Sequence, residues 1–140
     1  MSAYVLMVSH GGFAEGLCDT LHMFAGNSEG IMSIGLRDGE SVERFRLRAQ
    51  TLIAQLDQQD ELLVLADLIG GSPLTTVLDV LQEKGMLTNT AVLGGMNLPM
   101  ALNAVLCKAQ GIRELKQMIL QEATASISEM TLQNEEEEDI

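Results

Sequence analysis

Apolar runs alternate with helical patterns along the whole chain. Residues 3–8 form a first apolar run without charge, and residues 30–36, 61–68 and 90–93 form three more. Continuous apolar runs of this length are typical of strands whose two faces are both covered. The sequence therefore predicts four buried β-strands at these positions.

Helical spacing of apolar residues fills the segments between and after these runs. The predicted helices cover residues 13–25, a segment capped by Ser41, a segment from Ser72-Pro73 to near Gly85, a segment after Asn97-Leu98-Pro99, and residues 112–123. Ser41 and Ser72 have hydroxyl side chains of the kind preferred at a helix N-cap, and proline suits the first helical turn. On the first helix, Leu17, Leu21 and Phe24 recur at helical spacing and are expected to face the core.

Strands that alternate with helices are joined by right-handed crossovers. We therefore expect an α/β fold of the flavodoxin-like class: an open, mostly parallel sheet of order 2-1-3-4 with helices on both faces. No internal repeat or linker interrupts the pattern, so residues 1–134 are assigned to one domain and residues 135–140 to an acidic tail. Residues 125–133 (ASISEMTLQ) are expected to form either a final strand or an irregular packing segment.

The distribution of charge argues against nucleic acid as a partner. The net charge is −12, and five of the acids lie in residues 135–139, so the rest of the chain still carries −7. The basic residues are scattered, apart from Arg44, Arg46 and Arg48 on one predicted helix. A protein that binds duplex nucleic acid needs a basic stripe, so no nucleic acid partner is expected.

Cysteine usage and hydropathy point to the cytoplasm. Cys18 and Cys107 lack metal-ligand spacing and are expected to be buried, reduced thiols. No apolar run approaches the roughly 20 residues that cross a bilayer, and the N-terminus lacks the pattern of a signal peptide. A cytoplasmic protein is the resulting expectation.

Residues capable of chemistry collect where the first and third strands end. The first strand leads into His10 and Gly11, and the third leads into Asp67, Gly70, Gly71 and Ser72. These strands are neighbours in a sheet of order 2-1-3-4, and their carboxyl ends form the switch point at which ligands bind in such sheets. We therefore expect these residues to form one site.

The residue types predict phosphoryl chemistry at this site. A carboxylate on one ring nitrogen of His10 leaves the other nitrogen as a nucleophile. Gly70 and Gly71 lead into a helix whose first amides lack intrahelical partners and can hold a phosphoryl group, to which Ser72 can add a hydroxyl donor. Taken singly, each residue is more often structural; their convergence predicts a phosphohistidine carrier that needs no metal or organic cofactor. His22, which lacks a ligand partner, is expected to have only a surface or packing role.

Three segments resemble the IIA domains of the mannose family of the sugar phosphotransferase system. They are VSHGGFAEGL (8–17), LADLIGGSPLTTV (65–77) and GGMNLPMAL (94–102), in order and at fitting distances. The resemblance implies a phosphotransferase component in which Nε2 of His10 accepts a phosphoryl group from phosphorylated HPr and passes it to a IIB component. Asp67 is then the orienting partner and Ser72 a donor to the phosphoryl oxygens, while the membrane IIC and IID components carry the sugar.

The resemblance also carries expectations about assembly. Members of the family are typically homodimers that exchange a C-terminal strand as an antiparallel edge, and residues 125–133 would be that strand here. Because this chain stops in an acidic tail, it looks like the stand-alone form, with its IIB partner on a separate chain.

The docking face is expected to be apolar. A negatively charged rim would repel a phosphorylated partner, so we expect the strand-end face to be locally neutral despite the acidic total. The candidate patch consists of Phe13, Leu68, Ile69, Met96, Leu98 and Met100.

Two other functions stay open at this point. The phosphotransfer subunit of a dihydroxyacetone kinase resembles this chain in fold and in the histidine of the first strand, although GGF after His10 and GGSP after Asp67 favour the sugar system. A non-catalytic regulatory module that senses phosphorylation and binds a transcription activator is the other alternative. The intact Asp67 and glycines argue against it.

Overall fold

A four-stranded parallel sheet organises the protein. The computed structural model describes residues 2–26 and 29–133, and within them the strand order is β2-β1-β3-β4, with every neighbouring pair parallel. The strands are β1 (Ala3–His10), β2 (Ile31–Leu36), β3 (Glu61–Ala66) and β4 (Thr90–Gly94). The predicted order is confirmed. The acidic tail predicted for residues 135–140 lies outside the described residues.

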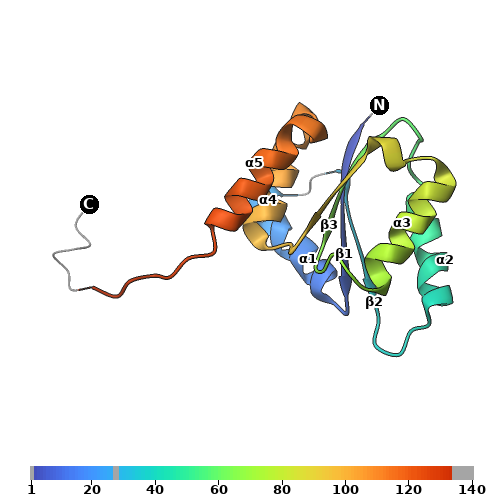
Figure 1. Cartoon of the computed structure of the whole chain (residues 1–140), viewed down its shortest axis with the longest axis horizontal. Helices are drawn as coiled ribbons and strands as arrows, with labels where there is room; N and C mark the ends of the chain where they lie inside the picture. The colour runs from blue at the N-terminus through green and yellow to red at the C-terminus, as the bar shows by residue number, and fades with distance from the viewer. Residues whose placement is uncertain (1, 27–28, 134–140) are drawn as a thin grey trace.

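Helices cover both faces of this sheet. They are α1 (Phe13–Ala25), α2 (Val42–Ile53), α3 (Ser72–Lys84), α4 (Leu98–Cys107) and α5 (Ile112–Ala125), with short 3₁₀ turns η1 (Leu87–Asn89) and η2 (Lys108–Gln110). In Figure 1, α1, α4 and α5 lie on one side of the sheet and α2 and α3 on the other. The flavodoxin-like arrangement expected from the sequence is therefore confirmed. None of the helices in the described ranges is long and apolar enough to cross a membrane.

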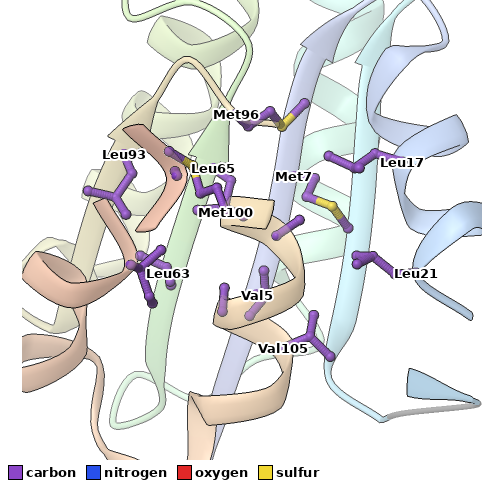
Figure 2. Packing of buried hydrophobic residues seen from close by; sticks show 14 of the residues in the cluster. Val5, Met7, Leu17, Leu21, Leu63, Leu65, Leu93, Met96, Met100 and Val105 are labelled. Carbon is purple, nitrogen blue, oxygen red and sulfur yellow. The ribbon is translucent and has the colours of Figure 1, made fainter. Parts of the chain in front are cut away.

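The core is split in two by the sheet. Side chains alternate along each strand, so Met7 and Leu65 pack under α1, α4 and α5, as Figure 2 shows, whereas Leu6 and Val64 pack under α2 and α3. The central strands are buried on both faces, which explains their unbroken apolar sequences.

Two of the differences between the predicted and observed strand ends bear on the site. β1 runs two residues further than predicted because Ser9 and His10 pair with Gly35 and Leu36 of β2. β3 stops at Ala66, whose carbonyl accepts the backbone N–H of Met96 where the chain leaves the sheet. His10 is therefore the last residue of its strand, whereas Asp67 lies just beyond the end of β3.

One residue of α1 that the sequence predicts in the core is exposed in the structure. Leu17 and Leu21 are buried as predicted, but Phe24 is exposed. The stripe that faces the sheet continues instead to Ala25, which packs against the core. Phe24 is rotated about 100° around the helix from Ala25 and falls outside the stripe.

Residues 126–133 form neither a strand nor a packing segment within the described chain. They leave the end of α5 and run away from the body of the protein in Figure 1. Their apolar side chains, Ile127, Met130 and Leu132, are exposed.

The cysteines are free but less buried than expected. Cys18 and Cys107 are half-buried and pack against the α1, α4 and α5 side of the core. Burial raises the pKa of the Cys18 thiol, and the acidic neighbour Asp19 adds to that effect, while a hydrogen bond with Ser33 opposes it. The thiol is therefore held in its unreactive, protonated form.

Candidate functional site

The predicted histidine and carboxylate meet at the carboxyl ends of β1 and β3. Nδ1 of His10 lies 2.9 Å from Oδ2 of Asp67, and the same oxygen accepts the backbone N–H of His10 at 2.9 Å. The backbone N–H of Asp67 in turn donates to the carbonyl of Val8 at 3.1 Å. These bonds follow from the parallel register, in which Val8 pairs with Ala66, so that Asp67 leaves β3 beside Ser9 and its carboxylate reaches the next residue, His10.

Three hydrogen bonds keep the Asp67 carboxylate ionised. Burial acts to raise its pKa, but the backbone N–H and ring of His10 and the backbone N–H of Leu68, at 2.8 Å from Oδ1, outweigh burial, so the pKa of Asp67 lies below its usual value. An ionised carboxylate only accepts hydrogen bonds. Nδ1 of His10 must therefore carry the hydrogen, which leaves the lone pair of a neutral ring on Nε2.

The second nitrogen of His10 faces the start of α3. A Cβ atom added to Gly71 would lie 3.0 Å from Cε1 and 3.2 Å from Nε2 of His10, so bare backbone approaches this edge of the ring. Gly71 has a φ of 101°, which L side chains rarely adopt. The His10 side chain is 45% exposed and Asp67 only 16%, so the ring is open to a partner while its support is covered.

Ser72 does not cap α3, in contrast to the expectation from the sequence. The N-cap residue is Gly71, no side chain caps the helix, and Ser72 is its first helical residue. Pro73, at the second position, has no N–H to contribute. The free amides of the first turn are therefore those of Ser72 and Leu74, which follow the glycine whose backbone faces the His10 ring.

The glycine-rich turns lie around this ring. Gly11 has a φ of 58°, which favours glycine, and its N–H donates to the carbonyl of Leu36 at 2.7 Å. A Cβ atom at Gly70 would meet no atom within 4 Å, so the space beside it is open. All six predicted site residues thus lie between the last residue of β1 and the start of α1 or between the end of β3 and the first residue of α3.

The apolar patch around the site is smaller than predicted. Phe13, Leu68 and Ile69 are exposed. Met96 and Met100 are buried instead, because Met96 is tied to the end of β3 by its backbone and Met100 lies on the inner face of α4. Leu98 is partly buried against the same core. The exposed patch therefore consists of Phe13, Leu68 and Ile69.

Comparison with known proteins agrees with this geometry. The family model described as "PTS system fructose IIA component" matches residues 4–120. This chain belongs to that family of sugar phosphotransferase IIA components. Its members are phosphocarriers in sugar uptake.

Individual relatives give the same result. The mannose-specific EIIAB component of Escherichia coli strain K12 is 28% identical over 108 residues, which are 77% of this chain and 32% of that protein. This IIA chain thus spans about a third of the length of that relative. The crystal structure of the IIA protein associated with the fucose utilization operon of Streptococcus pneumoniae matches with a TM-score of 0.79 and 27% identity, covering 92% of this chain and 93% of that one.

One further structure supports the fold. The mannose/sorbose specific IIA subunit from Enterococcus faecalis has a TM-score of 0.81 at 21% identity, covering 96% of this chain and 98% of that chain.

The other titratable residues do not join this site. His22 is exposed on α1, in agreement with the surface role expected for it. Among the described residues, no group of three or more histidine, cysteine or acidic side chains is placed to hold a metal ion. An open groove between β2 and α2, lined by Ser33, Arg44, Leu47 and others, does not include His10. The exposed ring of His10 is open to solvent.

Sequence reasoning missed the supports beneath the His10 turn. Ser9 is fully buried, and its hydroxyl bonds to the turn that follows His10. Gly35 lies against the same turn from β2. A signal was present for Ser9, because a single hydroxyl at the end of an otherwise apolar strand needs a hydrogen-bonding partner.

Proposed function

We propose that this IIA chain is a phosphocarrier in which His10 accepts a phosphoryl group from phosphorylated HPr and passes it to a IIB component during sugar uptake. The observation that carries the proposal is the bond between Nδ1 of His10 and Asp67, which leaves Nε2 as the nucleophile beside Gly71. We place the reaction in the cytoplasm, with the membrane IIC and IID components moving the sugar.

The proposed transfer is a single in-line exchange of phosphorus between nitrogens. The lone pair of Nε2 attacks phosphorus as the P–N bond on the donor histidine breaks, and the electron pair of that bond returns to the donor nitrogen. Positive charge develops on the His10 ring, and the ionised Asp67 carboxylate at 2.9 Å stabilises it. Transfer to the IIB component repeats the exchange with His10 as the donor.

The start of α3 and the glycine turns supply the proposed phosphoryl cradle. The amides of Ser72 and Leu74 and the positive end of the α3 dipole are placed to hold the equatorial oxygens, and the Ser72 hydroxyl adds a donor. The backbone of Gly11, Gly70 and Gly71 leaves room for the group. Catalysis then consists mainly of positioning and electrostatic stabilisation, as is general for phosphoryl transfer.

The exposed patch of Phe13, Leu68 and Ile69 is the proposed docking surface for both partners. Phe13 is the first residue of α1, and Leu68 and Ile69 follow Asp67 on the loop after β3, so the patch contains no charged side chain. A neutral apolar contact next to the reacting nitrogen avoids repulsion of a phosphorylated partner by this acidic protein.

We further propose that the chain acts as a homodimer that exchanges residues 126–133. These residues run away from their own chain with Ile127, Met130 and Leu132 exposed, and β4 is an outer strand of the described sheet with an unpaired edge. An antiparallel strand from a second copy would cover both surfaces. Light scattering is expected to give the mass of a dimer for the full chain and of a monomer for a chain ending at residue 125; a monomeric full chain would contradict the exchange.

The experiment that tests the phosphocarrier proposal is intact mass after incubation with phosphoenolpyruvate, enzyme I and HPr. The wild-type chain is expected to gain one phosphoryl group that is labile to acid. His10→Ala should gain none. His22→Ala is the matched control, since it removes the chain's other histidine, and it should gain one group like the wild type. A wild-type protein that gains nothing, or a His10→Ala protein that gains the same group, would contradict the proposal.

A further inference from the structure

Ser9 is a fully buried polar residue directly before His10. Its Oγ accepts the backbone N–H of Ala14 at 2.8 Å and donates to the carbonyl of Gly11 at 3.5 Å. A buried hydroxyl is costly unless it is hydrogen-bonded, and this one bonds to both ends of the short connection between β1 and α1. One side chain therefore fixes the turn that directly follows His10.

Gly35 supports the same turn from the neighbouring strand. It pairs with Ser9 in the β1–β2 register, and a Cβ atom at Gly35 would overlap the carbonyl oxygen of Gly11. The turn therefore lies flat across the end of β2, where only glycine leaves room for it. The N–H of Gly11 donates to the carbonyl of Leu36, which holds the turn in that place.

An ion pair anchors this end of β2. The carbonyl of Gly35 accepts Nη2 of Arg48 at 2.6 Å, and Arg48 bonds to both carboxylate oxygens of Glu40, at 2.7 and 2.8 Å. The support of the His10 turn thus continues from Ser9 through Gly35 into α2.

We propose that Ser9 is a positioning residue for phosphoryl transfer, acting with Gly35 through the turn at residues 11–12 to hold the ring of His10 against Asp67 and Gly71. The inference rests on the phosphocarrier function proposed above. The strand pairing of β1 fixes the backbone before His10, and the turn fixes the backbone after it. If the turn moves, Nδ1 of His10 is displaced from Oδ2 of Asp67, and Nε2 is displaced from the start of α3.

The expected effect is on the rate of transfer rather than on binding of the partner. Ser9 is buried and cannot touch HPr. A displacement of the reacting atom by about 1 Å costs roughly 10²-fold in rate. Ser9→Ala should therefore lower the maximal rate of transfer from phospho-HPr by about 10- to 100-fold. The half-saturating concentration of phospho-HPr should stay close to that of the wild type.

Three variants separate positioning from simple loss of stability. Ser9→Thr keeps the hydroxyl and should recover most of the rate. Gly35→Ala must displace the Gly11 carbonyl and should lower the rate as Ser9→Ala does. Ile53→Val, in the core under α2 and α3, is the control: it loosens packing away from the turn and should retain the wild-type rate per folded molecule.

The test combines single-turnover transfer with NMR spectra of the His10 ring in the unphosphorylated protein. In Ser9→Ala and Gly35→Ala, the ring nitrogen signals should move away from those of a ring with its hydrogen fixed on Nδ1. Unchanged rates and ring signals in both variants would overturn the inference, and so would a folded Ser9→Thr protein as slow as Ser9→Ala. If the wild type accepts no phosphoryl group, the phosphocarrier proposal fails, while the ring spectra still decide whether Ser9 positions His10.

Discussion

Oδ2 of Asp67 accepts two hydrogen bonds from His10, one from its backbone N–H and one from Nδ1 of its ring, both at 2.9 Å. A single oxygen thereby fixes the strand end and the orientation of the ring. Oδ1 of the same carboxylate accepts the N–H of Leu68. Since all three donors need an acceptor, the site requires a carboxylate at position 67 and not only a polar side chain.

Asp67→Asn tests this requirement. The amide has one oxygen, so its NH₂ group must face either the donors of His10 or the N–H of Leu68. In either orientation the ring loses its stabilising charge, and where the NH₂ group faces His10 the ring also loses its fixed hydrogen on Nδ1. The transfer rate should therefore fall by about 10²- to 10⁴-fold. Single-turnover transfer from phospho-HPr measures the loss, with circular dichroism to confirm folding. A folded variant with the wild-type rate would show that the carboxylate is dispensable.

Gly71→Ala tests the approach of bare backbone to Nε2. The new Cβ would lie 3.2 Å from Nε2 and occupy space proposed for the phosphoryl group, so the transfer rate should fall at least about tenfold. Gly85→Ala is the matched control, because Gly85 also has a positive φ, of 77°, but lies at the far end of α3. Each change should cost about 1–3 kcal/mol of stability through backbone strain. Equal rates in the two variants at equal folded fraction would contradict a role for Gly71 in the site.

The arrangement of the site could be predicted from the sequence because it depends on the order of the strands in the sheet. Buried strands joined by helical crossovers specify the order 2-1-3-4, and that order brings His10 beside Asp67 without any knowledge of side-chain contacts. The details that escaped prediction depend on local geometry. Ser72 has the side chain of a helix cap, but the N-cap of α3 lies one residue earlier, at Gly71, whose φ of 101° sets the direction of the helix.

Burial near the site could not be read from residue type. Met96 and Met100 lie in loop and helix segments close to the strand ends, and nothing in their spacing distinguishes a docking surface from a core. Met96 is buried because the hydrogen bond from its N–H to the carbonyl of Ala66 draws the segment after β4 inward. Ile69, in contrast, rests its side chain against Gly94, where a Cβ would collide with it, and stays 65% exposed.

Ile69→Glu tests the docking patch. A negative charge beside His10 should repel phospho-HPr and slow transfer by about tenfold at low salt, and the deficit should shrink as salt screens the charge. Leu106→Glu adds the same charge at a site of similar exposure, 62%, near the other end of α4, and should leave transfer unchanged. If Ile69→Glu transfers at the wild-type rate at low salt, the partner docks elsewhere.

The hydrogen-bonded ion pair of Glu40 with Arg48 makes the stability of the protein depend on pH in the acid range. Hydrogen bonds from the Arg48 side chain and from the backbone N–H of Arg37 lower the pKa of Glu40 from 4.5 to about 2. Because the pKa is lowered in the folded state, the stability that Glu40 contributes is complete above pH 4.5 and is lost as the pH falls toward about 2. Urea unfolding should therefore show Glu40→Gln less stable than the wild type near neutral pH, with the gap closing over that acid range. A gap that stays constant on acidification would contradict the pairing.

In the phosphorylated protein, we expect Nε2 of His10 to carry the phosphoryl group while Nδ1 stays bonded to Asp67. The most direct measurement is ³¹P and ¹⁵N NMR of the chain after phosphorylation by phospho-HPr, with both ring nitrogens of His10 labelled. We expect phosphorus coupled to Nε2 and a hydrogen retained on Nδ1. Phosphorus on Nδ1, or on any residue other than His10, would contradict it.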